Sequence, residues 1–553
     1  MKSTIYFLSY KIAFFLLLNF CYAQAQEKLA PDVYLIRLTD KNQNAYDLSH
    51  PEQFLSQRAL QRRQRQSIEL HINDLPVSQV YIDSLKKMGF EILNRSKWFN
   101  AVSVRTTNLL LLDKLLGVSF VKHIQQNKIL KSAQVIRNKF ELQTTPVLFD
   151  SSHFYGPSFS QIAIHKGNFL QSKGFRGQGL LIAVLDAGFY NARNMTGFDS
   201  LWMANRVILT RDFVKAGGDV FVADQHGSEV LSVIAATEPG WLEGTAPKAS
   251  FLLLRSEDTS SEYPVEEFNW VAAAELADSL GVDIINTSLG YTTFDDPSLS
   301  HTYADMNGHT AISSIAAGIA ASKGMIVVVS AGNEGNQPWK QISAPADADS
   351  VLTAGAIDIN GFPAAFSSRG PTYDRRIKPD VVAVGNGTVV QLVNNAFARF
   401  NGTSFSAPII TGLTACLWQA CPDKSNMEII RAIQQYSSQY ATPDSILGYG
   451  IPDFKYALYA LNPLQQPGPG YINMYPNPFT SQFTMEFDAI PEGVVKVCIF
   501  DVSGRKLFEK QESVNKTFLN KIAINQLSSL SRGVYIVKIF SGSKTLEGKV
   551  LKL

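Results

Sequence analysis

Ser404 has the surroundings of a serine that could act as a nucleophile. It lies in the stretch 401–408, Asn-Gly-Thr-Ser-Phe-Ser-Ala-Pro, and an apolar run follows from Ile409 to Trp418. A run that is apolar nearly all round predicts a helix buried in a large core. Thr403 and Ser404 suit the first turn of such a helix, and Pro408 would cost about one helical bond. An attacking oxygen and the oxyanion it creates would then lie at the positive helix end; a capped core helix is the alternative.

Three further polar residues stand beside apolar segments. Asp186 ends the run 182–185, His226 opens an apolar helical segment, and Asn333 lies just past the run 325–329. An imidazole beside a carboxylate can take the proton of a serine and later return it. An asparagine past a strand can direct its NH₂ group at the site of a neighbouring strand. Taken singly, each residue also fits a turn aspartate, a helix cap or a polar loop.

The elements that would position these residues alternate along the chain. Between about 161 and 460, short apolar runs are separated by helical patterns, which predicts an α/β fold with a parallel sheet covered on both faces. In such sheets, sites gather outside the carboxyl ends of the strands. The predicted strands are 180–185, 251–254, 282–285, 325–329 and 351–357, and the predicted helices are 228–236, 264–280 and 310–323.

The four residues, in the order Asp186, His226, Asn333 and Ser404, resemble the catalytic blocks of the subtilisin-like (subtilase) serine peptidases. The resemblance covers most of 161–460 and implies the three-layer subtilisin-like fold. A related group has glutamate in place of the histidine, and His226 argues against it. The esterase motif Gly-x-Ser-x-Gly is not met at Ser404. The matching blocks are Gly402-Thr403-Ser404 with Ser406-Ala407-Pro408, His226-Gly227-Ser228-x-Val230, Ile285-Asn286-Thr287-Ser288-Leu289-Gly290, Phe366-Ser367-Ser368-x-Gly370-Pro371 and Gly448-Tyr449-Gly450.

The resemblance implies a role for each residue. Ser404 would be the nucleophile, His226 the general base and then the acid, and Asp186 the carboxylate that orients the imidazole. The Asn333 side chain and the Ser404 backbone N–H would form the oxyanion hole. Ser343 could lie at the floor of the pocket for the side chain before the cleaved bond. No acidic residue is evident there, so the cleavage preference stays open. The walls of that pocket would be Ser288, Leu289, Gly290, Ala331 and Gly332.

Length, composition and net charge indicate the class of protein. The chain has 553 residues, of which 45% are hydrophobic and 18% charged, which predicts two to four globular domains. A formal net charge of +2 gives no reason to expect a nucleic-acid partner. Lys2 and Lys11 precede an apolar run, and Ala23-Gln24-Ala25 fits a cleavage site, so 1–25 is predicted to be a secretory signal. The cysteines Cys416, Cys421 and Cys498 that would remain form no disulfide framework.

Residues 27–130 predict a separate unit. The pattern gives strands at 33–38, 90–93, 101–105 and 118–123 and helices at 77–88 and 109–116, the order of a small α+β ferredoxin-like domain. The basic stretch 58–65 is interpreted as a solvated helix face. Residues 131–160 lack periodicity and predict an exposed connector with a maturation cleavage. The subtilase resemblance implies that 27–130 is an inhibitory pro-domain; a permanent structural domain is the alternative.

After the peptidase domain, 161–461, and a Pro- and Gly-rich linker, 462–470, the pattern changes. Six short strands predict a β-sandwich over 471–553, at 481–488, 494–501, 506–509, 516–524, 534–540 and 544–551. The segments 475–479 and 530–535 and the lysine-containing end resemble the C-terminal sorting domain of the type IX secretion system. That resemblance implies export through the periplasm and outer membrane of a Gram-negative cell; a sugar-binding or spacer sandwich is the alternative.

These features predict a secreted serine endopeptidase, made as a zymogen, that acts on proteins or peptides as a monomer and needs no cofactor for its chemistry. Structural calcium is possible at 295–296 or 347–349, but solvated turns explain both pairs of aspartates, and no metal ligand is assigned. One alternative is a surface binding or adhesion protein on an inactive peptidase scaffold. Another is a processing peptidase dedicated to a single partner.

Overall fold

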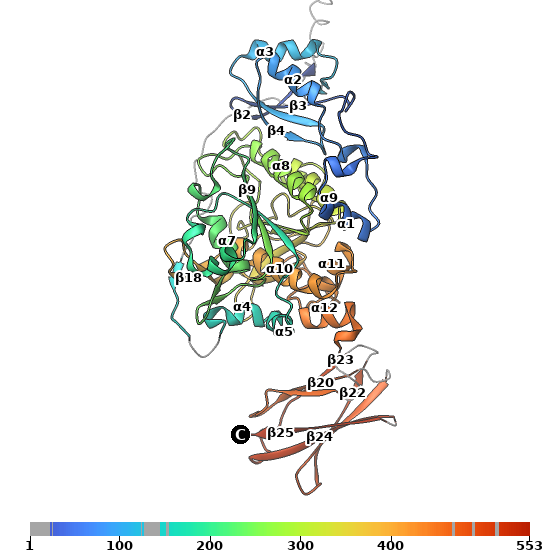
Figure 1. Ribbon diagram of the computed structural model, residues 1–553. Coiled ribbons are helices and arrows are strands. Elements are labelled where there is room, and N and C mark those ends of the chain that lie inside the picture. The colour runs from blue at the N-terminus through green and yellow to red at the C-terminus, as the bar shows by residue number, and fades with distance from the viewer. Residues whose placement is uncertain are drawn as a thin grey trace, which may run out of the picture. The chain divides into compact units, whose positions relative to one another are not determined.

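The computed structural model describes residues 23–24, 26–122, 124–125, 144–150, 154–466, 471–488, 493–514, 519–542 and 544–553. Apart from 23–24, the predicted signal therefore lies outside the described residues, as does much of the connector. Contacts divide the chain into two compact units, one ending at Pro452 and one beginning at Asp453 (Figure 1). Among the described residues, no helix combines the length and apolarity that crossing a bilayer requires.

A seven-stranded parallel sheet forms the centre of the first unit, in the order β16-β15-β14-β13-β8-β12-β9. All five predicted strands belong to it, while the edge strands β9 and β16 were not predicted. These two strands give no clear apolar run in the sequence, because half of the residues of β9 are exposed and β16 has only four residues. The strands are β8 (Leu181–Asp186), β9 (Val207–Asp212), β12 (Ser250–Arg255), β13 (Ile284–Thr287), β14 (Ile326–Ser330), β15 (Leu352–Ile357) and β16 (Val381–Val384).

Helices cover both faces of this sheet, as predicted. Alternate strand residues such as Ala183 and Val327 pack in one core cluster with α8 (Val265–Leu280) and α9 (Ile312–Ser322). The strand residues between them, whose side chains point to the other face of the sheet, are equally buried. There α7 (His226–Ala235) and α10 (Thr403–Ala420) pack against the strands. The helix predicted after Ser404 is thus α10, and all but one of its residues are buried.

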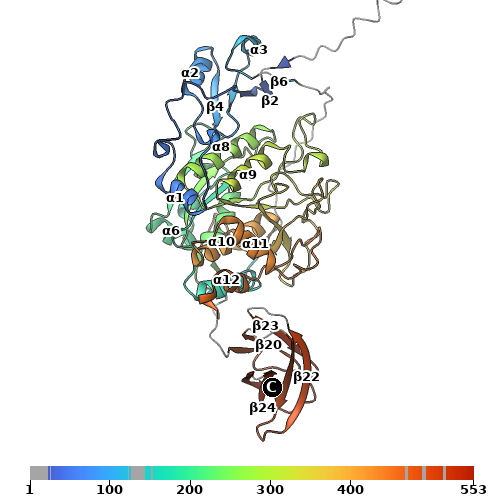
Figure 2. The same ribbon diagram turned by 90° about the vertical axis from the view of Figure 1, so that its right-hand side faces the viewer.

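The amino-terminal residues form a four-stranded antiparallel sheet, β2-β3-β5-β4, that packs on α8 (Figure 2). Three predicted strands and both predicted helices are present. The strand predicted at 118–123 is wrong over its described part, since Val121 makes only a single bridge, to Leu38. The unpredicted β2 pairs with β3 instead. The elements are β2 (Gln26–Ala30), β3 (Val33–Arg37), α1 (Gln57–Arg65), α2 (Gln79–Lys87), β4 (Glu91–Ser96), β5 (Ala101–Arg105) and α3 (Leu109–Lys114).

The basic stretch on α1 is not a solvated face. Arg62 is 0% exposed and Arg63 is 2% exposed. Of the four arginines on this helix, only Arg58 and Arg65 keep substantially exposed side chains. A buried guanidinium requires hydrogen-bonding partners, and apart from Asp74 these come from residues 278–323.

The second unit is a β-sandwich of two antiparallel sheets, β19-β20-β23 and β22-β21-β24-β25, around its own apolar core. The six predicted strands are present, and β19 is added in front of them. The elements are α12 (Phe454–Leu461), β19 (Ile472–Tyr475), β20 (Phe483–Asp488), β21 (Gly493–Phe500), β22 (Lys506–Val514), β23 (Leu519–Ile524), β24 (Gly533–Ser541) and β25 (Lys544–Lys552).

Candidate active site

Asp186 and His226 form a buried pair. Asp186 is the last residue of β8, and His226 is the first residue of α7. The distance from His226 Nδ1 to Asp186 Oδ1 is 2.7 Å, and the backbone N–H of Ala187 donates to the same oxygen at 2.8 Å. Burial opposes the charged imidazole, but the neighbouring carboxylates, Asp186 foremost, together outweigh it, and the pKa of His226 is raised. The pair therefore holds an oriented, basic imidazole.

Gly227 lets this helix approach β8 closely. A Cβ atom at Gly227 would lie 2.3 Å from the backbone oxygen of Gly188 and 2.9 Å from Asp186 Cβ. No side chain larger than hydrogen fits that gap. The backbone N–H of His226 also donates to Asp224 Oδ1 at 2.8 Å, which fixes the start of the helix. The His-Gly dipeptide thus sets the position of the imidazole against the carboxylate.

Ser404 is the second residue of α10 and is held through its own carbonyl. Pro408 lies inside the helix and has no N–H to give to the carbonyl four residues earlier, which is that of Ser404. The Ser288 hydroxyl donates to this carbonyl instead, at 2.8 Å. The Ser404 hydroxyl donates to the backbone oxygen of Ser288 at 3.4 Å, a long and weak hydrogen bond. The hydroxyl can therefore turn at little cost.

Asn333 follows β14, and its amide orientation is fixed by Thr403. The Asn333 side-chain oxygen accepts the Thr403 backbone N–H at 2.9 Å and the Thr403 hydroxyl at 3.0 Å. Two donors on one atom identify it as the oxygen. The NH₂ group consequently points away from Thr403, and a Cβ atom at Gly402 would lie 3.8 Å from it. An amide donor thus lies beside the turn that precedes Ser404.

The four predicted residues come from elements that meet on one side of the sheet. Asp186 ends β8 and Asn333 follows β14, so both lie at carboxyl ends of parallel strands. The His226 ring lies 6.2 Å, centroid to centroid, from the ring of Phe405, the residue next to Ser404. The hydrogen bonds of Thr403 join Asn333 to the same helix start. This arrangement can combine a nucleophile, a base and an amide donor.

The predicted pocket residues have an acidic neighbour that the sequence pattern does not reveal. A Cβ atom at Gly332 would lie 2.5 Å from Glu334 Oε2 and 3.1 Å from Ser343 Oγ, and one at Gly290 would lie 2.2 Å from Ser343 Oγ. The expectation that no acidic residue lies there is therefore wrong. Burial raises the pKa of Glu334, while the Ser368 hydroxyl, which donates to it at 2.8 Å, opposes the shift.

Glu229 is a second residue that sequence reasoning missed. It lies one helical turn after His226 and is 2% exposed. Its Oε1 atom is buried and meets no hydrogen-bond donor in the described part of the chain. Burial raises its pKa to about 7, although His226 opposes the shift. The available signal was a glutamate on a helix that otherwise carries, after His226, only apolar residues, glycine and two serines.

We expect Glu229→Gln to shift the acid limb of the kcat/KM–pH profile to lower pH. The base must be neutral to accept a proton, and an ionised Glu229 raises the pKa of His226 by favouring the imidazolium. Removing that charge lets His226 lose its proton at lower pH. Profiles of hydrolysis of a chromogenic peptide measure this, with Glu238→Gln, just beyond the same helix, as the control. An unmoved limb, or one moved to higher pH, would contradict this role.

No group of three or more His, Cys, Asp or Glu side chains that could hold a metal ion occurs among the described residues. The interpretation of Asp347 as a solvated turn residue is wrong, because it is fully buried and accepts the backbone N–H of Gly308 at 2.7 Å. Asp296 does lie in a turn, where it accepts the Ser298 hydroxyl at 2.6 Å. The three described cysteines are buried and free.

Comparison with known families gives three matches. Residues 177–450 match the subtilase family, residues 33–142 match the peptidase S8 propeptide domain of Bacteroidota, and residues 473–552 match the secretion system C-terminal sorting domain. Together these matches span most of the chain, and each falls on one of the three parts described above.

Curated relatives match the central part. A thermophilic serine proteinase of Bacillus sp. (strain AK1) is 32% identical over 288 residues, which are 52% of this chain and 61% of the relative. Subtilisin DY of Bacillus licheniformis is 28% identical over 271 residues, 48% of this chain and 87% of the relative. Among solved structures, the prenylagaramide maturation protease PagA is 21% identical, with a TM-score of 0.43 and coverage of 54% of this chain and 99% of that one. The strands, the site geometry and the family match agree: residues 177–450 form a domain of the subtilase family.

Proposed function

We propose that the protein is a secreted serine endopeptidase that hydrolyses peptide bonds through Ser404, His226 and Asp186. The observation that carries the proposal is the buried 2.7 Å contact between His226 Nδ1 and Asp186 Oδ1 beside the start of α10. A histidine held by a carboxylate at this place can use its second ring nitrogen as a base towards the serine. The match of residues 177–450 to the subtilase family supports the same assignment.

The chemistry follows from these positions. Ser404 Oγ attacks the substrate carbonyl while His226 Nε2 accepts its proton, and Asp186 stabilises the resulting imidazolium. The oxyanion receives hydrogen bonds from Asn333 Nδ2 and the Ser404 backbone N–H. His226 then protonates the leaving amine, and a water molecule repeats the sequence to release the acyl group. The weak bond between the Ser404 hydroxyl and Ser288 gives the hydroxyl freedom to start this cycle.

Substrate would lie along Ser288, Leu289 and Gly290 on one side and Ala331 and Gly332 on the other. The backbone of 288–290 continues β13, so an extended peptide could add to it as a further strand. Glu334 and Ser343, next to these glycines, would make the side-chain pocket polar.

A fluorophosphonate probe tests the proposed function. We expect the probe to modify the mature enzyme at one residue, Ser404, identified by mass spectrometry of the modified peptide. Ser406→Ala is the matched control, because Ser406 lies on the same helix and its hydroxyl only donates to the Ala383 carbonyl at 3.2 Å. Labelling that survives Ser404→Ala, or that occurs at another serine, would refute the assignment.

The flanking parts support production as a zymogen and export. Residues 27–130 would inhibit the enzyme until a cleavage within 131–160, and the segment 1–25 would direct the chain to the periplasm. The propeptide and sorting-domain matches support this interpretation and a Bacteroidota host. The mature enzyme would then leave through the type IX machinery.

Deletion of 471–553 is expected to trap the protein in the periplasm of its host. The sandwich folds around its own core, so its removal leaves the apolar core of the peptidase part intact. Immunoblots of periplasm, cell surface and medium measure the distribution. The same tail fused to a periplasmic fluorescent protein should direct that protein outward. Normal export of the truncated chain would exclude the sorting role.

A further inference from the structure

The pro-domain contacts the peptidase at two separate places. Its sheet packs on α8 through an apolar cluster that includes Leu29, Val33 and Phe268. The second contact is made by residues 56–75, which we call the anchor segment; it contains α1 and the short helix η2 (Ile72–Asp74). Figure 1 shows α1 beside α9 and α11 (Asn426–Gln435), apart from α2 and α3.

Arg62 of the anchor segment caps two helices of the peptidase. Its guanidinium donates to the backbone oxygen of Asp278 at 3.2 Å and of Lys323 at 3.1 Å, and also to that of Val282. These carbonyls lie at or just beyond the carboxyl ends of α8 and α9, where helices leave oxygens without intrahelical donors. A cation is also favoured there by the helix dipole. Arg62 thus adds donors at the ends of both helices, although the Asp278 oxygen already accepts the Gly281 N–H at 3.1 Å.

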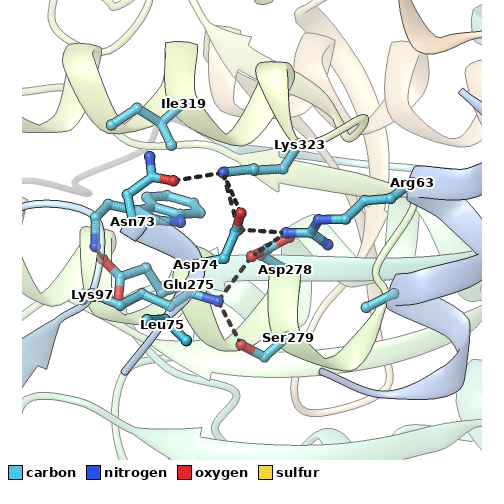
Figure 3. Close-up of polar contacts among 12 residues, drawn as sticks. Arg63, Asn73, Asp74, Leu75, Lys97, Glu275, Asp278, Ser279, Ile319 and Lys323 are labelled. Carbon is cyan, nitrogen blue, oxygen red and sulfur yellow. Dashed lines mark hydrogen bonds and ion pairs between the residues drawn. The ribbon is translucent and has the colours of Figure 1, made fainter. Parts of the chain in front are cut away.

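A buried ionic network joins the same elements (Figure 3). Arg63 donates to Asp278 Oδ1 at 2.8 Å and to Asp74 Oδ1 at 3.0 Å. Lys97 reaches Asp278 Oδ2 at 2.9 Å, and Lys323 reaches Asp74 Oδ2 at 3.0 Å. Although Asp278 is fully buried, which alone would raise its pKa, Lys97 and the two arginines hold that pKa well below its ordinary value. The network draws charges from both the pro-domain and the peptidase, so neither part completes it alone.

The anchor segment also approaches the peptidase backbone closely. A Cβ atom at Gly281 would lie 2.5 Å from the backbone nitrogen of Ala59, and one at Gly324 would lie 2.7 Å from Gln66 Nε2. Gln66 Nε2 donates to Gly324 O at 2.8 Å, and Gln66 Oε1 accepts the backbone N–H of Asn426 at 2.9 Å. These contacts require the anchor segment and the peptidase to fit together closely enough for backbone atoms to meet. Pairing of surface charges alone would not require so close a fit.

The anchor segment lies at the opposite edge of the sheet from the catalytic residues. Arg58 donates to the backbone oxygen of Gly179, just before β8, and also contacts Asp283, just before β13. Asp186 is at the other end of β8, seven residues after Gly179, or roughly 20 Å along the strand. The contacts of the anchor segment therefore need nothing from the catalytic cleft.

We propose that the anchor segment holds the pro-domain on the peptidase after the connector is cut and the cleft is empty, so that the enzyme persists as a non-covalent complex of two chains. The partner is the protein's own cleaved pro-domain, and the proposal rests on the proposed maturation. The apolar contact with α8 supplies affinity, and the anchor segment supplies a second attachment point at which the buried charges specify the partner.

The test uses the full chain with Ser404→Ala, so its outcome does not depend on catalysis. Recognition sites for a specific protease, inserted after Gln125 and before Thr144, allow the connecting residues to be removed completely. We expect the fragment before the first site to co-elute with the peptidase at nanomolar concentration. Separation of the two fragments at micromolar concentration would overturn the proposal.

Two arginine variants, one buried and one exposed, test whether the anchor segment is the site that holds the pro-domain on the peptidase. Arg62→Ala is expected to raise the dissociation constant about 100-fold, because it removes a buried, hydrogen-bonded charge. Arg65→Ala, on the same helix but with a 48% exposed side chain 3.9 Å from Asp283, should change it less than about threefold. If Arg62→Ala does not fold, Gln66→Ala, which removes two hydrogen bonds to the peptidase, takes its place against the same control. Equal effects of the buried and the exposed variant would also overturn the proposal.

Discussion

Ser404→Ala is expected to lower kcat for peptide hydrolysis by about 10⁶-fold, the loss that removal of the serine causes in subtilisin. Without the hydroxyl no acyl-enzyme forms, while the Asn333 donor and the pocket still bind substrate. KM should therefore change little. The same variant should accumulate with its connector uncut if maturation is autocatalytic. Initial rates on a peptide substrate measure the first effect, and immunoblots against the pro-domain measure the second.

Ser406→Ala separates chemistry from folding in this experiment. Ser406 is buried on the same helix, so its loss tests whether removing a hydroxyl from α10 disturbs the fold. We expect this variant to keep its rate within about tenfold and to lose about 1 kcal/mol of stability with its hydrogen bond. An active Ser404→Ala enzyme would exclude Ser404 as the nucleophile.

Asp186→Asn is expected to lower kcat by about 10⁴-fold with the shape of the site preserved. The amide carries no charge, so the imidazolium loses its stabilisation. Its NH₂ group also favours the tautomer of His226 with the proton on Nε2, and that nitrogen then cannot accept the serine proton. Steady-state kinetics measure the loss, and thermal unfolding monitors the fold.

Asp212→Asn is the matched control for this variant. Asp212 ends β9 as Asp186 ends β8, and it is buried in an ion pair with Arg255 at 3.0 Å. This variant should lose stability and keep most of its kcat. If the two variants lowered the rate equally, Asp186 would have a structural role only.

The central domain was predictable because its signals are local. Buried parallel strands are continuous apolar runs, and the polar residue that ends each run is visible in the sequence. Since parallel strands share one carboxyl edge, the positions of Asp186 and Asn333 after two such runs are enough to predict that they lie together. The edge strand β9 escaped prediction because half its residues face solvent and give no apolar run.

The errors occurred where the partner of a residue is distant in sequence. Arg62 and Arg63 lie in a basic stretch that reads as solvated, and their carboxylate partner, Asp278, is more than 200 positions away. The position beside β3 that the predicted strand 118–123 would take is occupied by β2. Strand pairing decides this, and the β-propensity of a single segment does not reveal it. Glu334 follows Asn333 directly, but nothing local indicates that its carboxyl turns back towards Gly332.

The proline inside α10 has a consequence for attempts to redesign cleavage preference. Because Pro408 leaves the Ser404 carbonyl to the Ser288 hydroxyl, one hydrogen bond joins the proposed wall of the substrate pocket to the residue proposed as the nucleophile. A bulkier or apolar replacement at position 288 is expected to displace Ser404 while it changes the shape of the proposed substrate pocket. Selectivity and turnover are coupled at that wall, so libraries that aim to change one without the other should leave Ser288 intact and vary the side chains around Ser343 and Glu334.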